Sequence, residues 1–132
     1  MALITYRYNM LASKVTCILF FISFLFMSTN AQVHCSRMKT SFPNYETAYK
    51  AIVSTRFEFN DKTNTSKSSW IRGASYYSCD GRVGFFFLKT DQKNYIFKDV
   101  PLKVWNEFKN APSHGKYYHA NIKNRYYYYL SQ

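Results

Sequence analysis

The sequence predicts an α+β fold, in which a small three-stranded antiparallel meander is followed by two short helices and preceded by an N-terminal helical extension. Three observations lead to this class. An amphipathic helical pattern occupies 42–56, three β-rich runs separated by turn signals follow it, and two helix-start signals come after them. A run of strands followed by a run of helices is typical of α+β proteins with an antiparallel sheet.

The first thirty-one residues have the layout of a secretory signal peptide. Met1–Lys14 carries two basic residues and no acid, Val15–Met27 is a largely apolar run of 13 residues, and Ser28–Ala31 is small and polar. The apolar run is shorter than the roughly 17–25 residues that span a bilayer. We therefore expect cleavage after Ala31 and export to the periplasm, the cell surface or the extracellular space. A retained membrane anchor is the alternative.

Cleavage would leave 101 residues with 16 Lys and Arg against 7 Asp and Glu, a formal charge of +9. One domain is the most that this length supports, which excludes multidomain enzymes and large cofactor folds. The positive charge favours anionic partners such as nucleic acid, anionic lipid or acidic glycan. Its alternative role is to keep a Tyr-rich protein soluble.

Two cysteines, Cys35 and Cys79, remain after cleavage, and an even count in an exported chain indicates one disulfide. The bridge would close a loop of 45 residues, which stabilises the fold by about 4 kcal/mol in the chain-entropy estimate. The cysteines form no CxxC motif and the three histidines, His34, His114 and His119, are scattered. We therefore expect no metal site and no cofactor.

The elements of the extension follow from periodicity. In the helix predicted over 42–56, apolar residues recur at helical spacing on one face, namely Tyr45, Ala48, Tyr49, Ile52 and Val53. Asn60–Ser69 is polar throughout and is predicted to be a loop. Residues 32–67 are therefore interpreted as a helical extension with its loop, and 68–132 as the domain proper.

Three strands are predicted at Trp70–Ser78, Arg82–Lys89 and Asn94–Asp99. The dipeptide Asp80-Gly81 is a hairpin-turn signal between the first two. The second strand is an almost continuous apolar run, which indicates a central strand covered on both faces. The 21 aromatic residues of 32–132 outnumber its 12 Val, Ile and Leu, so many rings are expected in the core.

Two helices and a terminal segment complete the chain. Pro101 starts a helix whose apolar face is predicted from Val104, Trp105, Phe108 and Ala111. Ser113 is the expected N-cap of a second helix over about 114–123. The segment Arg125–Leu130 is predicted to be a last strand or an extended tail.

The stretch from Ser68 to Tyr126 resembles the KTSC domain, a small module that takes its name from the C-terminus of some lysyl-tRNA synthetases. The family pattern opens with Ser-Ser-x-Ile and has a central Tyr-x-Tyr strand followed by Val-Pro and an aromatic-bearing helix. It closes with Ala-x-Ser-x-Gly-x-Tyr, an Ile and an Arg-Tyr. The matching residues are Ser68-Ser69-Trp70-Ile71, Tyr95-Ile96-Phe97, Val100-Pro101, Val104, Phe108, Ala111-Pro112-Ser113-His114-Gly115-Lys116-Tyr117, Ile122 and Arg125-Tyr126.

The resemblance implies a small RNA-binding module, found in bacterial and phage proteins, that has no established catalytic residues. One position departs from the pattern, because Phe97 stands where the family has the second Tyr and so lacks a hydroxyl. Phe97 cannot make any ligand contact that this hydroxyl makes in the family. The helix at 42–56 and the signal segment lie outside the module.

The best candidate site is an interleaving of basic and aromatic residues, the mixture with which single-strand binders stack bases and meet phosphates. Strand alternation predicts equally well that the rings line the core while the lysines are solvated. We expect an exported, non-catalytic binder of an anionic polymer, with nucleic acid the leading ligand. The candidate residues are Tyr95, Phe97, Lys98, Lys116, Tyr117, Tyr118, Lys123, Arg125 and Tyr126.

Two alternatives belong to other classes. The first is a cell-envelope or extracellular interaction protein that binds its partner through the tyrosines of 126–129, because consecutive residues of a strand must project to both faces. The second is a small secreted nuclease in which His114 or His119 acts as the general acid or base. Nothing in the sequence fixes such a pair in one place.

Overall fold

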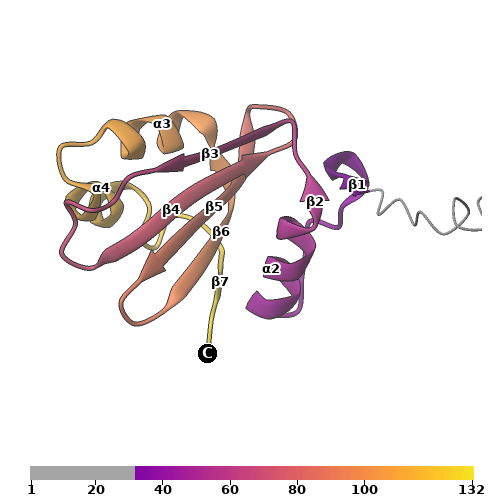
Figure 1. Cartoon of the computed structure of the whole chain (residues 1–132), viewed down its shortest axis with the longest axis horizontal. Coiled ribbons are helices and arrows are strands. Elements are labelled where there is room, and N and C mark those ends of the chain that lie inside the picture. The colour runs from indigo at the N-terminus through magenta and orange to yellow at the C-terminus, as the bar shows by residue number, and fades with distance from the viewer. Residues whose placement is uncertain (1–31) are drawn as a thin grey trace, which may run out of the picture. The chain divides into compact units, whose positions relative to one another are not determined.

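A five-stranded antiparallel sheet forms the middle of the protein in a computed structural model, which describes residues 32–132 (Figure 1). The strand order is β3-β4-β5-β6-β7, so each strand pairs with its neighbours in sequence. The five strands are Phe59–Thr63 (β3), Ile71–Ser78 (β4), Val83–Thr90 (β5), Asn94–Pro101 (β6) and Tyr128–Leu130 (β7). The predicted signal segment, residues 1–31, lies outside the described residues.

The α+β class is confirmed, but the predicted three-stranded meander understates the sheet by the two edge strands. The expected loop at 60–69 contains most of β3, in which alternate residues from Phe59 to Thr63 are half-buried. Its polar inward residue, Asp61, is satisfied there because its carboxylate accepts hydrogen bonds from Trp105 and Lys109. A hydrophilic sequence can therefore form an edge strand in this place.

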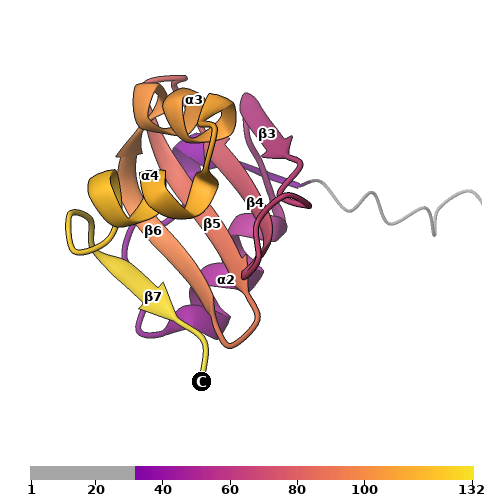
Figure 2. The ribbon, with the colours of Figure 1, turned by 90° about the vertical axis from the view of Figure 1, so that its left-hand side faces the viewer.

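Helices α3 (Leu102–Asn110) and α4 (His114–Asn121) cover one face of the sheet (Figure 2). Trp105 and Phe108 of α3 pack on Tyr76 and Phe86 of the central strands, with ring centroids 4.9–5.7 Å apart. The predicted N-cap is observed, since the Ser113 side chain accepts a hydrogen bond from the backbone at the start of α4. Pro101 is the N-cap of α3.

The opposite face of the sheet carries the N-terminal extension, which contains α2 (Tyr45–Val53), a single 3₁₀ turn at Cys35–Arg37 (η1) and a short parallel pair. The pair joins β1 (Val33–His34) to β2 (Thr55–Arg56). The helix is shorter than the predicted 42–56, because Asn44 caps its first turn and Ser54 ends it. A second core forms between this extension and the sheet, from Cys35, Tyr45, Ala48, Ile52, Phe57, Phe85, Ile96 and Tyr129.

The predicted disulfide is present and joins Cys35 of η1 to Cys79, the residue after β4. It links the extension directly to the sheet. Both cores are mainly aromatic, as the composition predicts, and rings from every strand of the sheet pack in them. Among residues 32–132, no helix is long and apolar enough to cross a membrane.

Candidate functional site

The predicted basic–aromatic set separates in the structure into rings that pack inside and cations that lie outside. Phe97 and Tyr118 belong to the core under α3 and α4, with only 1% and 7% of their surfaces exposed. Tyr95 stacks on Phe97 with centroids 5.8 Å apart. The prediction that these rings offer open faces is therefore wrong for Phe97 and Tyr118, because a core with few aliphatic residues takes its volume from aromatic ones.

Tyr117 and Tyr126 are half-buried against the same core. The Tyr117 hydroxyl donates a hydrogen bond to Oε2 of Glu107 over 2.6 Å. Burial and this carboxylate raise the pKa of Tyr117 well above its usual range. The side chain therefore ties α4 to α3, and its ring does not stand free to stack on a base.

The predicted cations remain at the surface but do not form a continuous strip with the rings. Lys116, Lys123 and Arg125 are exposed on or just after α4. Lys98 lies on β6, half-buried, with its ammonium 3.7 Å from a carboxylate oxygen of Asp99. These four charges can attract an anion, but the aromatic partners predicted for them are turned into the core.

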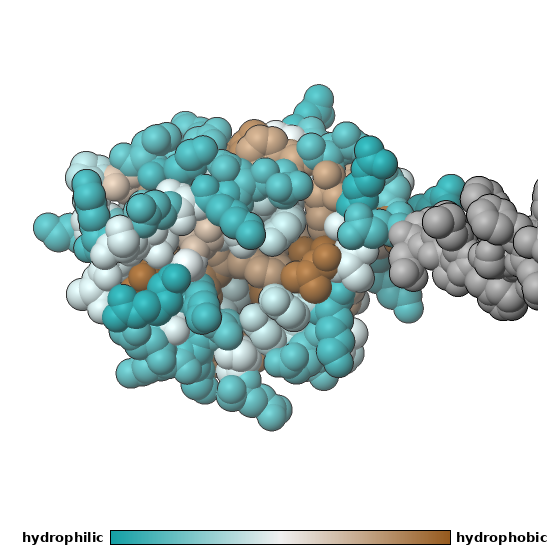
Figure 3. All heavy atoms as spheres, in the orientation of Figure 1, coloured by the Kyte–Doolittle hydropathy of each residue, from teal (hydrophilic) through white to brown (hydrophobic). Residues whose placement is uncertain are grey.

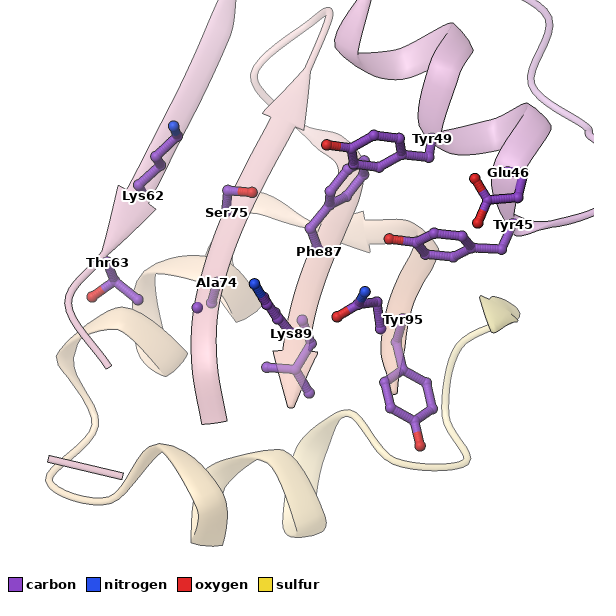
Figure 4. A pocket seen from close by; sticks show the side chains of 13 residues that line it. Tyr45, Glu46, Tyr49, Lys62, Thr63, Ala74, Ser75, Phe87, Lys89 and Tyr95 are labelled. Carbon is purple, nitrogen blue, oxygen red and sulfur yellow. The ribbon is translucent and has the colours of Figure 1, made fainter. Parts of the chain in front are cut away.

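A groove between α2 and the sheet brings together a different set of residues (Figure 4). Tyr45 and Tyr49 project from α2 on one side, and Lys62 stands on β3 at the other. Phe87 lies between them on β5. The groove has a volume of about 520 Å³, and its other lining residues are Glu46, Thr63, Gly73, Ala74, Ser75, Leu88, Lys89, Asn94 and Tyr95.

Three aromatic residues of this groove form a continuous row with Tyr77, which lies beside it. The rings of Tyr45 and Tyr49 stack with centroids 5.9 Å apart, and Tyr49 lies 6.1 Å from Phe87. Phe87 in turn lies 5.0 Å from Tyr77 on β4. Tyr49, inside the row, is 41% exposed, so the row includes an accessible ring. In the space-filling view apolar atoms reach the surface in the middle of this side of the molecule, surrounded by hydrophilic ones (Figure 3).

Two lysines give the groove a positive balance. Lys62 and Lys89 are both exposed, and neither has an ion-pair partner among the described residues. Glu46 is the one acidic residue in the lining. The other carboxylates are engaged elsewhere: Asp61, Asp91, Asp99 and Glu107 pair with lysines or arginines, Glu58 pairs with His34, and Asp80 holds the β4–β5 turn.

Sequence reasoning missed this groove for two reasons. The helical pattern assigns Tyr49 to the buried face, whereas α2 covers only part of the sheet and leaves that ring at the edge. The apolar run of β5 likewise indicates a strand covered on both faces, and Phe87 is covered only in part. The tyrosine pair at i and i+4 on the extension helix is the signal that was available.

A second hollow, of about 670 Å³, lies where two segments of the family pattern meet. Ser68-Ser69-Trp70 lines one side and Ala111–Gly115 the other. A Cβ on Gly115 would lie 2.9 Å from Nε1 of Trp70, so glycine is needed for this close approach. The Ser68 and Ser113 hydroxyls accept hydrogen bonds from backbone N–H groups. These motif residues therefore have structural roles that account for the pattern.

The two histidines of the nuclease alternative pack on different aromatic residues. His114 stacks on Phe108 with centroids 4.8 Å apart. His119 lies beside the rings of Trp70 and Tyr118, at 5.7 and 5.3 Å. Neither has a carboxylate hydrogen-bond partner among residues 32–132.

Comparison with known proteins finds a family for the stretch that contains β4 to β6, α3 and α4. The described fold is a small α+β sheet domain with an added N-terminal layer. The family model of the KTSC domain matches residues 67–127, so the chain carries a KTSC domain. A solved KTSC domain protein from Yersinia pestis has 21% sequence identity and a TM-score of 0.47, covering 56% of this chain and 100% of that chain. No curated protein matches the chain.

The match places β4 to β6, α3 and α4 inside the KTSC domain and leaves α2 and β3 outside it. One side of the groove in Figure 4 therefore comes from the matched part of the sheet, while Tyr45, Tyr49 and Lys62 come from α2 and β3, outside the match. The family pattern alone would not reveal this combination.

Proposed function

We propose that this protein is an exported binding module that holds an anionic polymer in the groove between α2 and the sheet, with single-stranded nucleic acid as the leading ligand. The observation that carries the proposal is the pairing of an accessible aromatic row with two lysines that have no ion-pair partner in the described structure. Single-strand binders combine these two features, because rings stack on bases while cations meet phosphates.

The aromatic row and the lysines have different roles in the proposed binding. Tyr49 and the half-buried Phe87 supply ring surface at the centre of the groove. Lys62 on β3 and Lys89 on β5 place ammonium groups on two strands of its sheet side. Binding is non-covalent and requires no catalytic group. The formal charge of +9 on residues 32–132 adds a long-range attraction for a polyanion.

The direct test is fluorescence anisotropy of the purified, disulfide-bonded protein with labelled single-stranded RNA, single-stranded DNA and heparin at several salt concentrations. We expect Tyr49→Ala to weaken nucleic-acid binding by about 1–3 kcal/mol, the usual contribution of one stacked base. Tyr127→Ala is the matched control, since this ring is 67% exposed and does not line the groove.

The lysines are tested by the salt dependence. Because each phosphate neutralised on a single strand contributes about −0.7 to the slope of log K against log salt, Lys62→Gln should make the slope shallower by about that amount. Lys103→Gln is the control, because Lys103 lies on the outer side of α3. This variant should change the slope less than Lys62→Gln does. Equal binding to heparin with indifference to Tyr49→Ala would reduce the interaction to bulk charge and reject the groove.

A protein-interaction role through the C-terminus has one observation in its favour. Tyr127 and Tyr128 are 67% and 42% exposed at the short edge strand β7. Tyr129, by contrast, is buried, and its hydroxyl accepts a hydrogen bond from the Phe42 backbone. A Tyr127→Ser, Tyr128→Ser double variant should then lose a partner in a crosslinking pull-down while keeping its thermal stability. An unchanged set of captured proteins would reject this role.

A further inference from the structure

We propose that His34, Cys35 and Cys79 form a zinc site when the disulfide is reduced. In the disulfide form one ring nitrogen of His34 and the two sulfur atoms all lie within 4.8 Å of one another. A tetrahedral zinc ion takes sulfur ligands at about 2.3 Å and imidazole nitrogen at about 2.0–2.1 Å. Its ligands therefore lie within a similar distance of each other, so a small rotation of the cysteine side chains suffices.

His34 already has the carboxylate partner that a metal-bound histidine uses. Its Nε2 lies 2.7 Å from Oε1 of Glu58. With Nε2–H donating to this carboxylate, the lone pair is on Nδ1, which lies 3.0 Å from the Ser36 hydroxyl and 3.3 Å from the Ser36 backbone N–H. A metal ion at Nδ1 would replace these two local contacts. A metal-bound histidine usually donates its other ring N–H to a carboxylate, which fixes the ring and makes it a stronger ligand. Glu58 on the segment after β2 is in that position.

The surroundings allow both a reductant and a metal ion to reach the cysteines. Cys79 is half-buried, and a hollow of about 190 Å³ lies beside the bridge. Met38, Asp80 and Asp99 are among its other lining residues. Thiolate and imidazole ligands favour zinc over the hard cations magnesium and calcium. Three protein ligands leave the fourth position of a tetrahedral ion to a water molecule.

The reaction balances with a thiol reductant. Two reductant thiols become one reductant disulfide, while the Cys35–Cys79 bond breaks and takes up two electrons and two protons to give two thiols. Zinc binding then forms two Zn–S bonds and one Zn–N bond and releases the two thiol protons to solvent. The two cysteines therefore either form the disulfide or bind the metal, but not both at once.

The consequence is that the extension stays linked to the sheet in both the oxidised and the reduced protein. Cys35 belongs to the extension and Cys79 follows β4 of the KTSC domain. The disulfide ties these parts in the oxidised protein, and zinc would tie them in the reduced protein. The sequence led us to expect no metal site. The proposal changes this expectation for the reduced protein only, because the three residues come together only after folding.

The experiment uses the full chain with Cys17→Ser, so that Cys35 and Cys79 are the only cysteines. Co²⁺ is titrated into the oxidised and the reduced protein, because its sulfur charge-transfer and tetrahedral ligand-field bands report thiolate ligation. We expect one Co²⁺ per reduced chain, displaced by Zn²⁺, and no such bands in the oxidised protein. Zn²⁺ should also raise the melting temperature of the reduced protein and leave that of the oxidised protein unchanged.

Variants separate the site from adventitious thiol binding. Glu58→Gln should weaken Zn²⁺ binding about 10–100-fold, the usual effect of losing such a carboxylate, and His34→Ala should weaken it further. His119→Ala, a histidine on α4, is the matched control and should not change the affinity. Two results would overturn the proposal: no thiolate bands in the reduced protein, or equal affinity of the His34→Ala and His119→Ala variants.

Discussion

At the scale of single residues, Asp61 connects the strand outside the KTSC match to the core within it. Its Oδ2 accepts hydrogen bonds from Nε1 of Trp105 over 3.0 Å and from Nζ of Lys109 over 2.7 Å. Trp105 is fully buried, so its indole N–H depends on this carboxylate for a partner. A residue outside the KTSC match thus satisfies a polar group in the core of the matched domain.

The hydrogen bonds from Lys109 and Trp105 lower the pKa of Asp61. The ionised carboxylate therefore stabilises the fold at any pH above its unfolded value of about 3.9, and this contribution is lost as the pH falls through the lower folded pKa. We expect Asp61→Asn to lower the free energy of unfolding by about 1 kcal/mol at neutral pH, since solvent partly screens the pair.

Thermal melts from pH 7 to pH 2 check this sign. The difference between the parent and Asp61→Asn should shrink as the pH falls below about 4. Asp91→Asn, which removes an exposed ion-paired carboxylate, should stay within about 0.5 kcal/mol of the parent. A difference between the parent and Asp61→Asn that is constant at every pH would show that ionisation of Asp61 does not contribute.

Gly84 gives a second test at this scale. A Cβ there would lie 2.2 Å from the backbone oxygen of Tyr77, on the paired strand. Gly84→Ala must therefore push β5 away from β4, and we expect a loss of about 1–3 kcal/mol or more in a urea unfolding curve. Gly73→Ala is the matched control, because its nearest neighbour would be the Lys89 Cβ at 3.9 Å. Similar losses in the two variants would contradict this account.

At the scale of elements, α2 depends on its attachment to the sheet. Its inward residues Ala48 and Ile52 are fully buried, and the disulfide fixes the chain just before it to the end of β4. A helix of nine residues is marginal without tertiary packing. The wall of the groove formed by Tyr45 and Tyr49 is therefore expected to be the part most sensitive to loss of the bridge.

Replacing both cysteines with serine tests this dependence. In the chain-entropy estimate, opening the loop costs about 4 kcal/mol of stability. We expect amide exchange in Cys35–Arg56 to accelerate more than exchange in β5 and β6, as measured by mass spectrometry without denaturant. Equal acceleration throughout residues 32–132 would mean that the bridge stabilises the whole fold and has no local effect on α2.

Some elements of the fold could be predicted from the sequence and others could not. Periodicity and turn signals predict the three central strands, α3 and α4, because these carry strong apolar patterns and clear caps. β3 could not be predicted, since its inward Asp61 finds partners only on α3. The exposure of Tyr49 depends on how far α2 covers the sheet, and this is a property of tertiary packing that a helical period does not contain.

At the scale of the whole molecule, charge and covering layers together determine the candidate site. Residues 32–132 carry a formal charge of +9, and the composition therefore predicts the class of ligand but not its location. The predicted location failed for Phe97 and Tyr118 because α3 and α4 cover their face of the sheet. On the other face α2 leaves a groove, and the extension supplies part of its lining.

The groove is tested most directly as the binding surface by an NMR titration of the ¹⁵N-labelled, disulfide-bonded protein with a short single-stranded oligonucleotide. The groove proposal predicts that the largest amide shift changes fall on α2, β3 and β5, around Tyr49, Lys62 and Phe87. Shift changes confined to α4 and the segment that follows it, or no changes at low salt, would contradict the groove as the binding surface.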